Sequence, residues 1–165
     1  MTAVREETGL EATTQMEILA ILRESKTVAL VGVSPNPLRS SNFVATYLTR
    51  TPYTMWAVNP HADEVLGLKA YPTLADLPAA PDIVDCFRKA SELPQVVEEA
   101  IAVGAKVVWF QLGLRNEEAA AMAVAAGLKV VQDHCLKIEH ARFAGGLHLV
   151  GFDTGVISSK RRRPV

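Results

Sequence analysis

The stretch Thr27-Val28-Ala29-Leu30-Val31-Gly32-Val33 decides the fold. It is rich in β-branched residues and carries no polar side chain after Thr27, which is typical of a strand that is covered on both faces. Further short apolar runs follow at intervals along the chain. They are Met55–Val58, Ile83–Phe87, Val107–Gln111 and Leu128–Gln132. Each of these runs is too short for a helix and is expected to form a strand of the same sheet.

Helical patterns separate the predicted strands. Thr14 and Glu17 have the spacing of a capping box, and Ser40 or Ser41 is expected to cap the helix that follows the first strand. Later helices are predicted over Leu93–Val103 and after Asn116, where Gly127 ends the second of them. Strands that alternate with helices predict an α/β fold. We expect a doubly wound parallel sheet of about five strands with helices on both faces, a three-layer α/β/α arrangement.

The length of 165 residues is that of one ordinary domain. The first 13 residues are polar and acidic and are expected to form a flexible N-terminal arm. Residues 14–155 are expected to form a single domain, in which Leu147–Phe152 can add a strand. Residues 156–165 form a basic C-terminal tail, which we interpret as solvated.

Composition excludes several classes of protein. The 17 Lys and Arg residues balance 18 Asp and Glu residues, which argues against a globally basic nucleic-acid binder. The apolar runs are far shorter than the ~18 residues needed to cross a bilayer, and no signal segment opens the chain. Cys86 and Cys135 are too few for a disulfide framework or a closed zinc site. The expectation is a cytoplasmic protein without a membrane or nucleic-acid partner, whereas a protein partner or a homo-oligomer remains open.

The segment Gly32–Ser41 runs from the first predicted strand to the start of a helix. In open parallel sheets, ligands bind beyond the carboxyl ends of the strands, where such loops lie. Gly32 permits close approach of the backbone, and Arg39 and Ser40 offer N–H and hydroxyl donors. The start of the helix adds unpaired amides. The loop is therefore a candidate phosphate cradle, although it can also be merely a rigid turn.

The loop does not carry the dinucleotide fingerprint. Only Gly32 of the three expected glycines is present, and Pro35 and Pro37 stiffen the loop instead. No Asp or Glu follows the second strand to accept hydrogen bonds from a ribose, because Asn59-Pro60-His61 stands there. Both departures disfavour NAD, whereas another phosphorylated nucleotide is still compatible with the sequence.

Several segments in register carry a resemblance to a known family. They are Val31–Arg39, Val58-Asn59-Pro60, Tyr71–Pro78, Asp82–Arg88, Trp109–Gly113 and Asp133-His134-Cys135. Over about residues 26–138 the chain resembles the small stand-alone CoA-binding proteins, a family that is similar to the N-terminal CoA-binding domain of the succinyl-CoA synthetase alpha subunit. The resemblance implies a Rossmann-like domain that holds coenzyme A or an acyl-CoA along the strand ends.

The resemblance also implies which residues contact CoA. Those expected near its phosphates are Gly32, Ser34, Pro35, Arg39 and Ser40. Those expected at the adenosine end are Asn59, Pro60 and His61. The rest of the groove is expected to be lined by Phe87, Arg88, Lys89, Gln111, Leu112 and Gly113. Relatives commonly carry a lysine where this chain has His61, so a phosphate contact there should be weaker or pH-dependent unless another cation substitutes.

The resemblance implies binding and no ligase chemistry, because the chain is too short to contain the phosphohistidine domain or the nucleotide-grasp subunit of the synthetase. No catalytic or metal-ligating residue is assigned. Cys86 is expected in the core, and Cys135 is expected to have a structural or pocket-rim role. The leading hypothesis is a non-catalytic CoA-binding module that acts as a sensor, carrier or regulatory subunit. The alternatives are a divergent dinucleotide oxidoreductase and an interaction protein with a vestigial nucleotide pocket.

Overall fold

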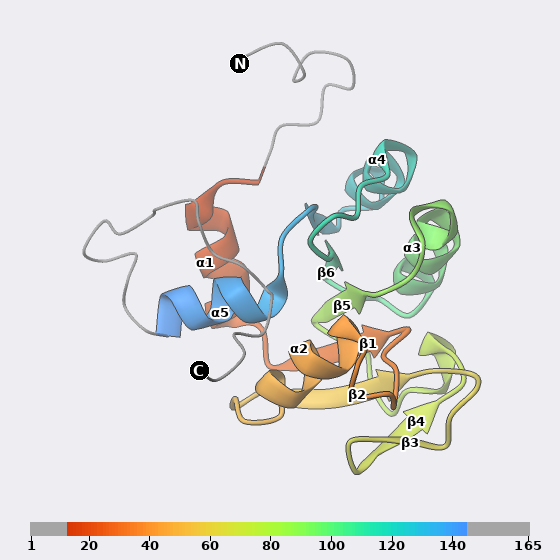
Figure 1. The fold of residues 1–165 in the computed structure, drawn as a ribbon. Coiled ribbons are helices and arrows are strands. Elements are labelled where there is room, and N and C mark those ends of the chain that lie inside the picture. Colours follow the sequence, from red (N-terminus) through yellow and green to blue (C-terminus); the bar gives the residue numbers. More distant parts are fainter. Residues whose placement is uncertain (1–12, 145–165) are drawn as a thin grey trace.

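The predicted first strand forms β1 (Thr27–Val31), which lies in the middle of the sheet. The structure is a computed structural model that describes residues 13–144. Over these residues seven strands form one sheet in the order β3-β4-β2-β1-β5-β6-β7. The sheet lies between two layers of helices (Figure 1). The predicted three-layer α/β/α architecture is therefore confirmed.

The strands are short, and all neighbours except one pair are parallel. The other strands are β2 (Thr54–Val58), β3 (Glu64–Val65), β4 (Leu68–Tyr71), β5 (Ile83–Cys86), β6 (Val107–Phe110) and β7 (Lys129–Val131). Only β3 and β4 are antiparallel, joined by a tight turn in which Leu66 and Gly67 have φ values of 53° and 75°. The five predicted strands are all present, and this hairpin adds two. The sequence allows a turn at Gly67 and a short extended piece around Ala70-Tyr71, which correspond to the turn and to β4.

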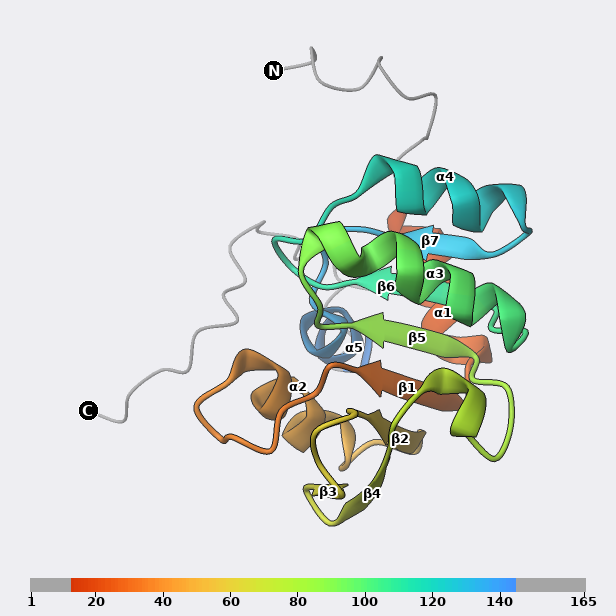
Figure 2. The ribbon, with the colours of Figure 1, turned by 90° about the vertical axis from the view of Figure 1, so that its right-hand side faces the viewer.

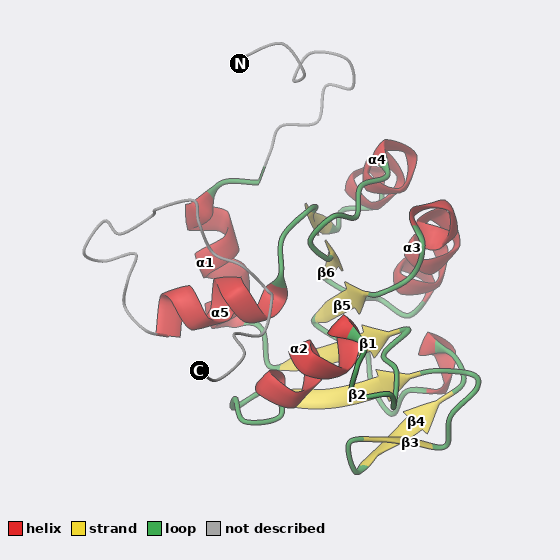
Figure 3. Ribbon diagram, viewed as in Figure 1, coloured by secondary structure: helices red, strands yellow, loops and turns green. Residues whose placement is uncertain are grey.

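Each face of the sheet carries its own group of helices (Figure 3). One face is covered by α1 (Gln15–Glu24), α2 (Ser40–Leu48) and α5 (Leu136–Ala144), and the other by α3 (Leu93–Ala102) and α4 (Glu117–Ala125). Two short 3₁₀ turns, η1 (Leu74–Asp76) and η2 (Ala90–Glu92), lie in the connections. Strand side chains alternate between the two resulting cores, so that Leu30 faces the first group of helices and Val31 the second.

Two of the observed helix caps agree with the sequence prediction, and a third does not. Thr14 and Glu17 form the predicted capping box, and the Asn116 side chain caps α4. The prediction that Ser40 or Ser41 caps α2 is wrong, because α2 starts at Ser40 and has no side-chain cap. The Ser41 hydroxyl instead accepts a hydrogen bond from the Ser34 N–H in the preceding loop.

Helix α5 has no counterpart in the sequence prediction. It buries Leu136 and Ile138, but it also buries Glu139 and Arg142, whose side chains pair at 3.7 Å. Charged residues on the buried side remove the apolar periodicity that would reveal the helix. The predicted strand Leu147–Phe152, the arm up to residue 12 and the basic tail lie outside the described residues. Within 13–144 no helix is both long and apolar enough to span a bilayer.

Candidate functional site

The sheet reverses its direction of winding between β1 and β5. After β1 the chain adds β2 and β4 on one side, and it then returns to add β5, β6 and β7 on the other. Loops that leave such a point in opposite directions open a crevice beyond the carboxyl ends of the strands. Figure 2 shows the arrowheads of β1, β5 and β6 at one edge, with the β1–α2 loop projecting past them. This edge carries most of the residues that the sequence singles out.

Gly32 forms the turn at the centre of this edge. Its φ of +86° lies in the left-handed region, and its N–H donates to the Val58 carbonyl at 2.9 Å. A Cβ on Gly32 would lie 3.1 Å from the Phe87 carbonyl oxygen and 3.2 Å from Cδ of Arg88. Only glycine therefore fits without strain. The predicted residues Gly32, Phe87 and Arg88 are brought into direct proximity.

The loop from Gly32 to α2 is held by its own short polar side chains. The Ser34 hydroxyl accepts a hydrogen bond from the Asn36 N–H, and the buried Asn42 donates to the Ser34 carbonyl at 2.9 Å. Asn36 in turn accepts a hydrogen bond from the Leu38 N–H. These contacts fix the loop while Leu38 stays 91% exposed. The backbone of the loop is thus ordered before any ligand arrives.

Cationic side chains flank this loop. Arg39 is exposed at the position immediately before α2, and Arg88 and Lys89 follow β5. None of the ion pairs within residues 13–144 uses any of these three cations. The first N–H groups of α2 also have no side-chain cap. Unpaired cations beside an uncapped helix start suit an anionic group such as a diphosphate.

Asn59 connects the end of β2 to the same loop. Its side-chain amide donates to the Val33 carbonyl at 2.9 Å, and its side-chain oxygen accepts the His61 N–H at 2.7 Å. Both ends of the side chain are therefore engaged within the protein, so Asn59 shapes the turn. Pro60 and His61 remain exposed beside it.

Gln111 lies at the end of β6 and is almost fully buried. Its amide nitrogen contacts Oδ1 of Asp85 at 2.5 Å. Asp85 is completely buried in β5, and burial raises its pKa to about 8, against the lowering effect of this hydrogen bond. Sequence reasoning assigned no role to Asp85. The available signal was a lone carboxylate inside an otherwise apolar strand.

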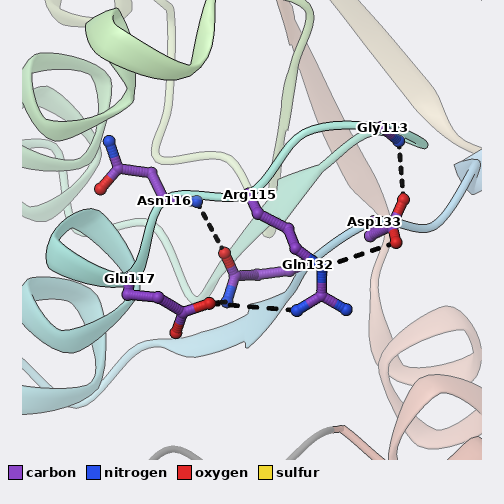
Figure 4. A network of polar contacts seen from close by, with 6 residues as sticks. All are labelled: Gly113, Arg115, Asn116, Glu117, Gln132 and Asp133. Carbon is purple, nitrogen blue, oxygen red and sulfur yellow. Dashed lines mark hydrogen bonds and ion pairs between the residues drawn. The ribbon is translucent and has the colours of Figure 1, made fainter. Parts of the chain in front are cut away.

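Leu112 and Gly113 extend the site toward β7. Leu112 is exposed, and the Gly113 N–H donates to the Asp133 carboxylate at 2.7 Å. A polar network continues from there and ties the β6–α4 loop to the end of β7 (Figure 4). Its other members are Arg115, Asn116, Glu117 and Gln132. The network fixes the position of the β6–α4 loop at this edge of the sheet.

Both cysteines are buried, Cys86 in the core as predicted and Cys135 immediately before α5. Burial raises the pKa of both thiols, and the nearby Asp85 raises them further. A raised pKa disfavours the reactive thiolate. The described part of the chain also has no group of three or more His, Cys, Asp or Glu side chains that could hold a metal ion.

A cavity of about 410 Å³ lies at the opposite, amino-terminal edge of the sheet, between α1, α3 and α4. Glu24 and Asp82 are the carboxylates in its lining. Asp82 accepts hydrogen bonds from the Lys26 and Thr27 N–H groups and pairs with Lys106 at 3.0 Å. Burial alone would raise the pKa of Asp82, but these contacts together lower it. Asp82 therefore joins the starts of β1 and β5, and its charge already stabilises the fold.

Comparison with known proteins shows the family to which the chain belongs. A family model described as a CoA binding domain matches residues 26–141. An uncharacterized protein of Bacillus subtilis, YneT, is 42% identical over 125 residues, which are 76% of this chain and 93% of YneT. A solved structure of a hypothetical protein from Pyrococcus horikoshii is 43% identical, with a TM-score of 0.78 over 88% of this chain and all of that one.

A longer relative has a named activity. The ADP-forming acetate–CoA ligase I of Archaeoglobus fulgidus is 28% identical over 129 residues, which are 72% of this chain and 19% of the ligase. The family match covers every strand, begins after α1 and ends within α5. The predicted resemblance is therefore confirmed. With its sheet, its switch point and its glycine turn, the chain belongs to the family of CoA-binding domains.

Proposed function

We propose that this protein binds coenzyme A or an acyl-CoA across the carboxyl ends of β2, β1, β5 and β6, as a non-catalytic module that senses, carries or regulates. One observation carries the proposal. In a chain of the CoA-binding family, the Gly32 turn, the uncapped start of α2 and the unpaired cations meet at the switch point of the sheet. A diphosphate needs such donors, and these lie where parallel sheets bind ligands.

The residues fit CoA in three regions. The phosphates would be held by the Gly32–Ser41 loop, through the side chains of Arg39 and Ser40 and the first amides of α2, with Ser34 and Pro35 shaping the loop. The adenosine end would lie against Pro60 and His61, in a turn held by Asn59. The pantetheine arm of CoA, which contains its amide groups, would cross the ends of β5 and β6. The residues there are Phe87, Arg88, Lys89, Gln111, Leu112 and Gly113.

Two features favour binding without turnover. The thiols of Cys86 and Cys135 are buried with raised pKa values, so neither is prepared as a nucleophile. The relative with a named ligase activity is about five times longer than the matched region, which spans 19% of it. The remaining part of that ligase lies outside the region that matches this chain.

Thermal unfolding with a panel of nucleotides tests the ligand. We expect CoA to raise the melting temperature more than dephospho-CoA, NAD or ATP, since a ligand at 100 times its Kd adds about 2.7 kcal/mol. A shift with NAD and none with CoA would instead support a dinucleotide oxidoreductase. If no nucleotide shifts the melt, the pocket is vestigial and the protein acts through another partner.

Release of free thiol tests the absence of turnover. Acetyl-CoA is incubated with the protein, and the CoA thiol is measured with a chromogenic disulfide. We expect no release above the buffer control at a protein concentration that binds the ligand. Steady release proportional to protein would contradict the non-catalytic part of the proposal and leave the binding part intact.

A further inference from the structure

Asp85 and Gln111 form a buried polar pair in an otherwise apolar part of the sheet. Asp85 is 0% exposed and Gln111 is 7% exposed, and they contact each other at 2.5 Å through Oδ1 and the amide nitrogen. The other carboxyl oxygen of Asp85, Oδ2, is buried and has no hydrogen-bond partner among residues 13–144. An unpaired buried oxygen costs free energy, so the pair is a feature that stability alone does not explain.

The pair lies directly beneath the crevice at the switch point. Asp85 is opposite Leu30 of β1 and Trp109 of β6, one residue before β5 ends. Gln111 is the first residue after β6, and its backbone carbonyl closes the turn to Leu114. Gln111 thus joins a fully buried carboxyl group to the edge where the CoA arm is proposed to cross.

The surroundings of Asp85 favour its neutral form. Burial raises its pKa to about 8. The titratable groups that interact with it are the thiols of Cys86, on the same strand, and Cys135, just before α5. Burial raises the pKa of both, so neither brings a charge near neutral pH. No cation of the described residues pairs with Asp85.

The charge of Asp85 limits the ways in which the Gln111 amide can be turned. An ionised carboxylate only accepts hydrogen bonds, so it must receive the amide N–H, which leaves the amide oxygen for the crevice. A neutral carboxyl group can donate its O–H to the amide oxygen, which turns the N–H groups toward the crevice. The heavy-atom positions are nearly the same in both arrangements, because the amide oxygen and nitrogen exchange places.

We propose that Asp85 is a positioning residue that turns the Gln111 amide so that its N–H groups face the crevice and donate to an amide carbonyl of the pantetheine arm of CoA. The inference rests on the proposed function and adds a specific contact to it. Asp85 itself touches no ligand and acts only through Gln111. Ionisation of Asp85 reverses the amide, and the contact with the carbonyl is then lost.

The pH dependence of binding tests the proposal. S-methyl-CoA is the probe, because it has no thiol that titrates and no thioester. Its Kd is measured by calorimetry at a series of pH values from 6.5 to 9 for the wild type, Asp85→Asn and Glu98→Gln. Glu98 is an exposed carboxylate on α3 and serves as the control for loss of one charge. We expect wild-type affinity to fall about 3- to 10-fold across this range, the equivalent of one hydrogen bond.

Asp85→Asn is expected to give a shallower profile than the wild type, because it keeps any contribution of His61 and loses only that of Asp85, and Glu98→Gln a profile parallel to that of the wild type. Parallel profiles for Asp85→Asn and the wild type would overturn the proposal. If Asp85→Asn does not fold, Gln111→Met replaces it, because this variant keeps the carboxyl group and removes the amide. It should bind more weakly and with a shallower pH profile than the wild type, and a retained wild-type slope would overturn the proposal.

A second readout does not depend on the ligand. The carboxyl ¹³C signal of Asp85, followed by NMR in the free protein, should titrate far above the usual range of aspartate, and a midpoint near 4 would overturn the inference. The two proposals also fail differently. Wild-type protein that binds no S-methyl-CoA at any pH contradicts the proposed function, whereas binding without the Asp85 effect contradicts only this inference.

Discussion

Arg39 is exposed immediately before α2 and makes no ion pair within residues 13–144, so its guanidinium is free to bind an anion. We expect Arg39→Ala to weaken CoA binding by about 1.5–3 kcal/mol, the range for hydrogen bonds to charged groups. Calorimetric titration with CoA measures the loss. The melting temperature of the ligand-free protein should hardly change, because the side chain supports no contact in the fold.

Arg50→Ala is the matched control for this variant. Arg50 is also an exposed arginine, but it lies beyond the other end of α2, away from the carboxyl edge. It should bind CoA as the wild type does. Equal losses of affinity in the two variants would show a general effect of net charge, and a large loss of ligand-free stability in Arg39→Ala would make Arg39 a structural residue.

His61 is exposed at the turn after β2, where the side chain of Asn59 accepts its N–H. A lysine at this position carries a permanent charge, whereas a histidine can lose its charge in the neutral range. We expect His61→Lys to bind CoA several-fold more tightly than the wild type at pH 8. Its preference for CoA over dephospho-CoA should also be larger than that of the wild type. Parallel affinities of the two proteins from pH 5.5 to 8 would remove His61 from the site.

At the level of elements, the turn after β1 depends on the close approach of β5. Gly32→Ala must accept both a φ of +86° and a Cβ 3.1 Å from the Phe87 carbonyl oxygen. Gly127→Ala meets a similar φ of +88° but nothing within 4 Å. We expect Gly127→Ala to cost about 1–2 kcal/mol through the backbone alone, and Gly32→Ala to cost about 1–3 kcal/mol more through overpacking.

Chemical denaturation of the two ligand-free variants measures this difference. Because both lose a glycine at nearly the same φ, subtracting one free energy of unfolding from the other isolates the contact between β1 and β5. Equal losses would mean that the Phe87 backbone shifts aside at little cost, and the turn would then not be rigid enough to act as a preformed cradle.

The sequence predicts those elements whose pattern of apolar side chains shows which faces are buried. β1 and β6 are apolar runs, and β5 is apolar except for Asp85, because both faces of these strands are buried. The β3–β4 hairpin is too short for a periodic pattern, and its turn depends on the unusual φ of Leu66. Helix α5 is hidden because it buries Glu139 and Arg142, so no pattern of apolar side chains marks it.

The candidate site is predictable to the same degree. The turn at Gly32 follows from a glycine after a buried strand, and the structure places this turn against Phe87 and Arg88. The pairing of Gln111 with Asp85 does not follow from the sequence, because the two residues are 26 positions apart and meet only through the alignment of β5 and β6. Contacts between strands need the register, which local patterns do not give.

For the whole molecule, the buried Asp85 makes stability depend on pH. Its pKa is about 8 in the folded protein and close to its ordinary value of 3.8 when unfolded. Between these values the folded state holds a proton that the unfolded state has released, so the free energy of unfolding falls as pH rises. The stabilising contribution is complete below pH 4, declines up to pH 8 and is constant above it. The slope is at most about 1.4 kcal/mol per pH unit.

Asp85→Asn removes this slope because asparagine does not titrate. We expect its free energy of unfolding, minus that of the wild type, to increase steadily from pH 5 to pH 8 in urea denaturation at fixed ionic strength. Other groups cancel in the difference, including His140, whose pKa is lowered by burial. A difference that stays constant over this range would show that Asp85 is ionised in the folded protein. The carboxyl group would then need a partner cation, which residues 13–144 do not supply.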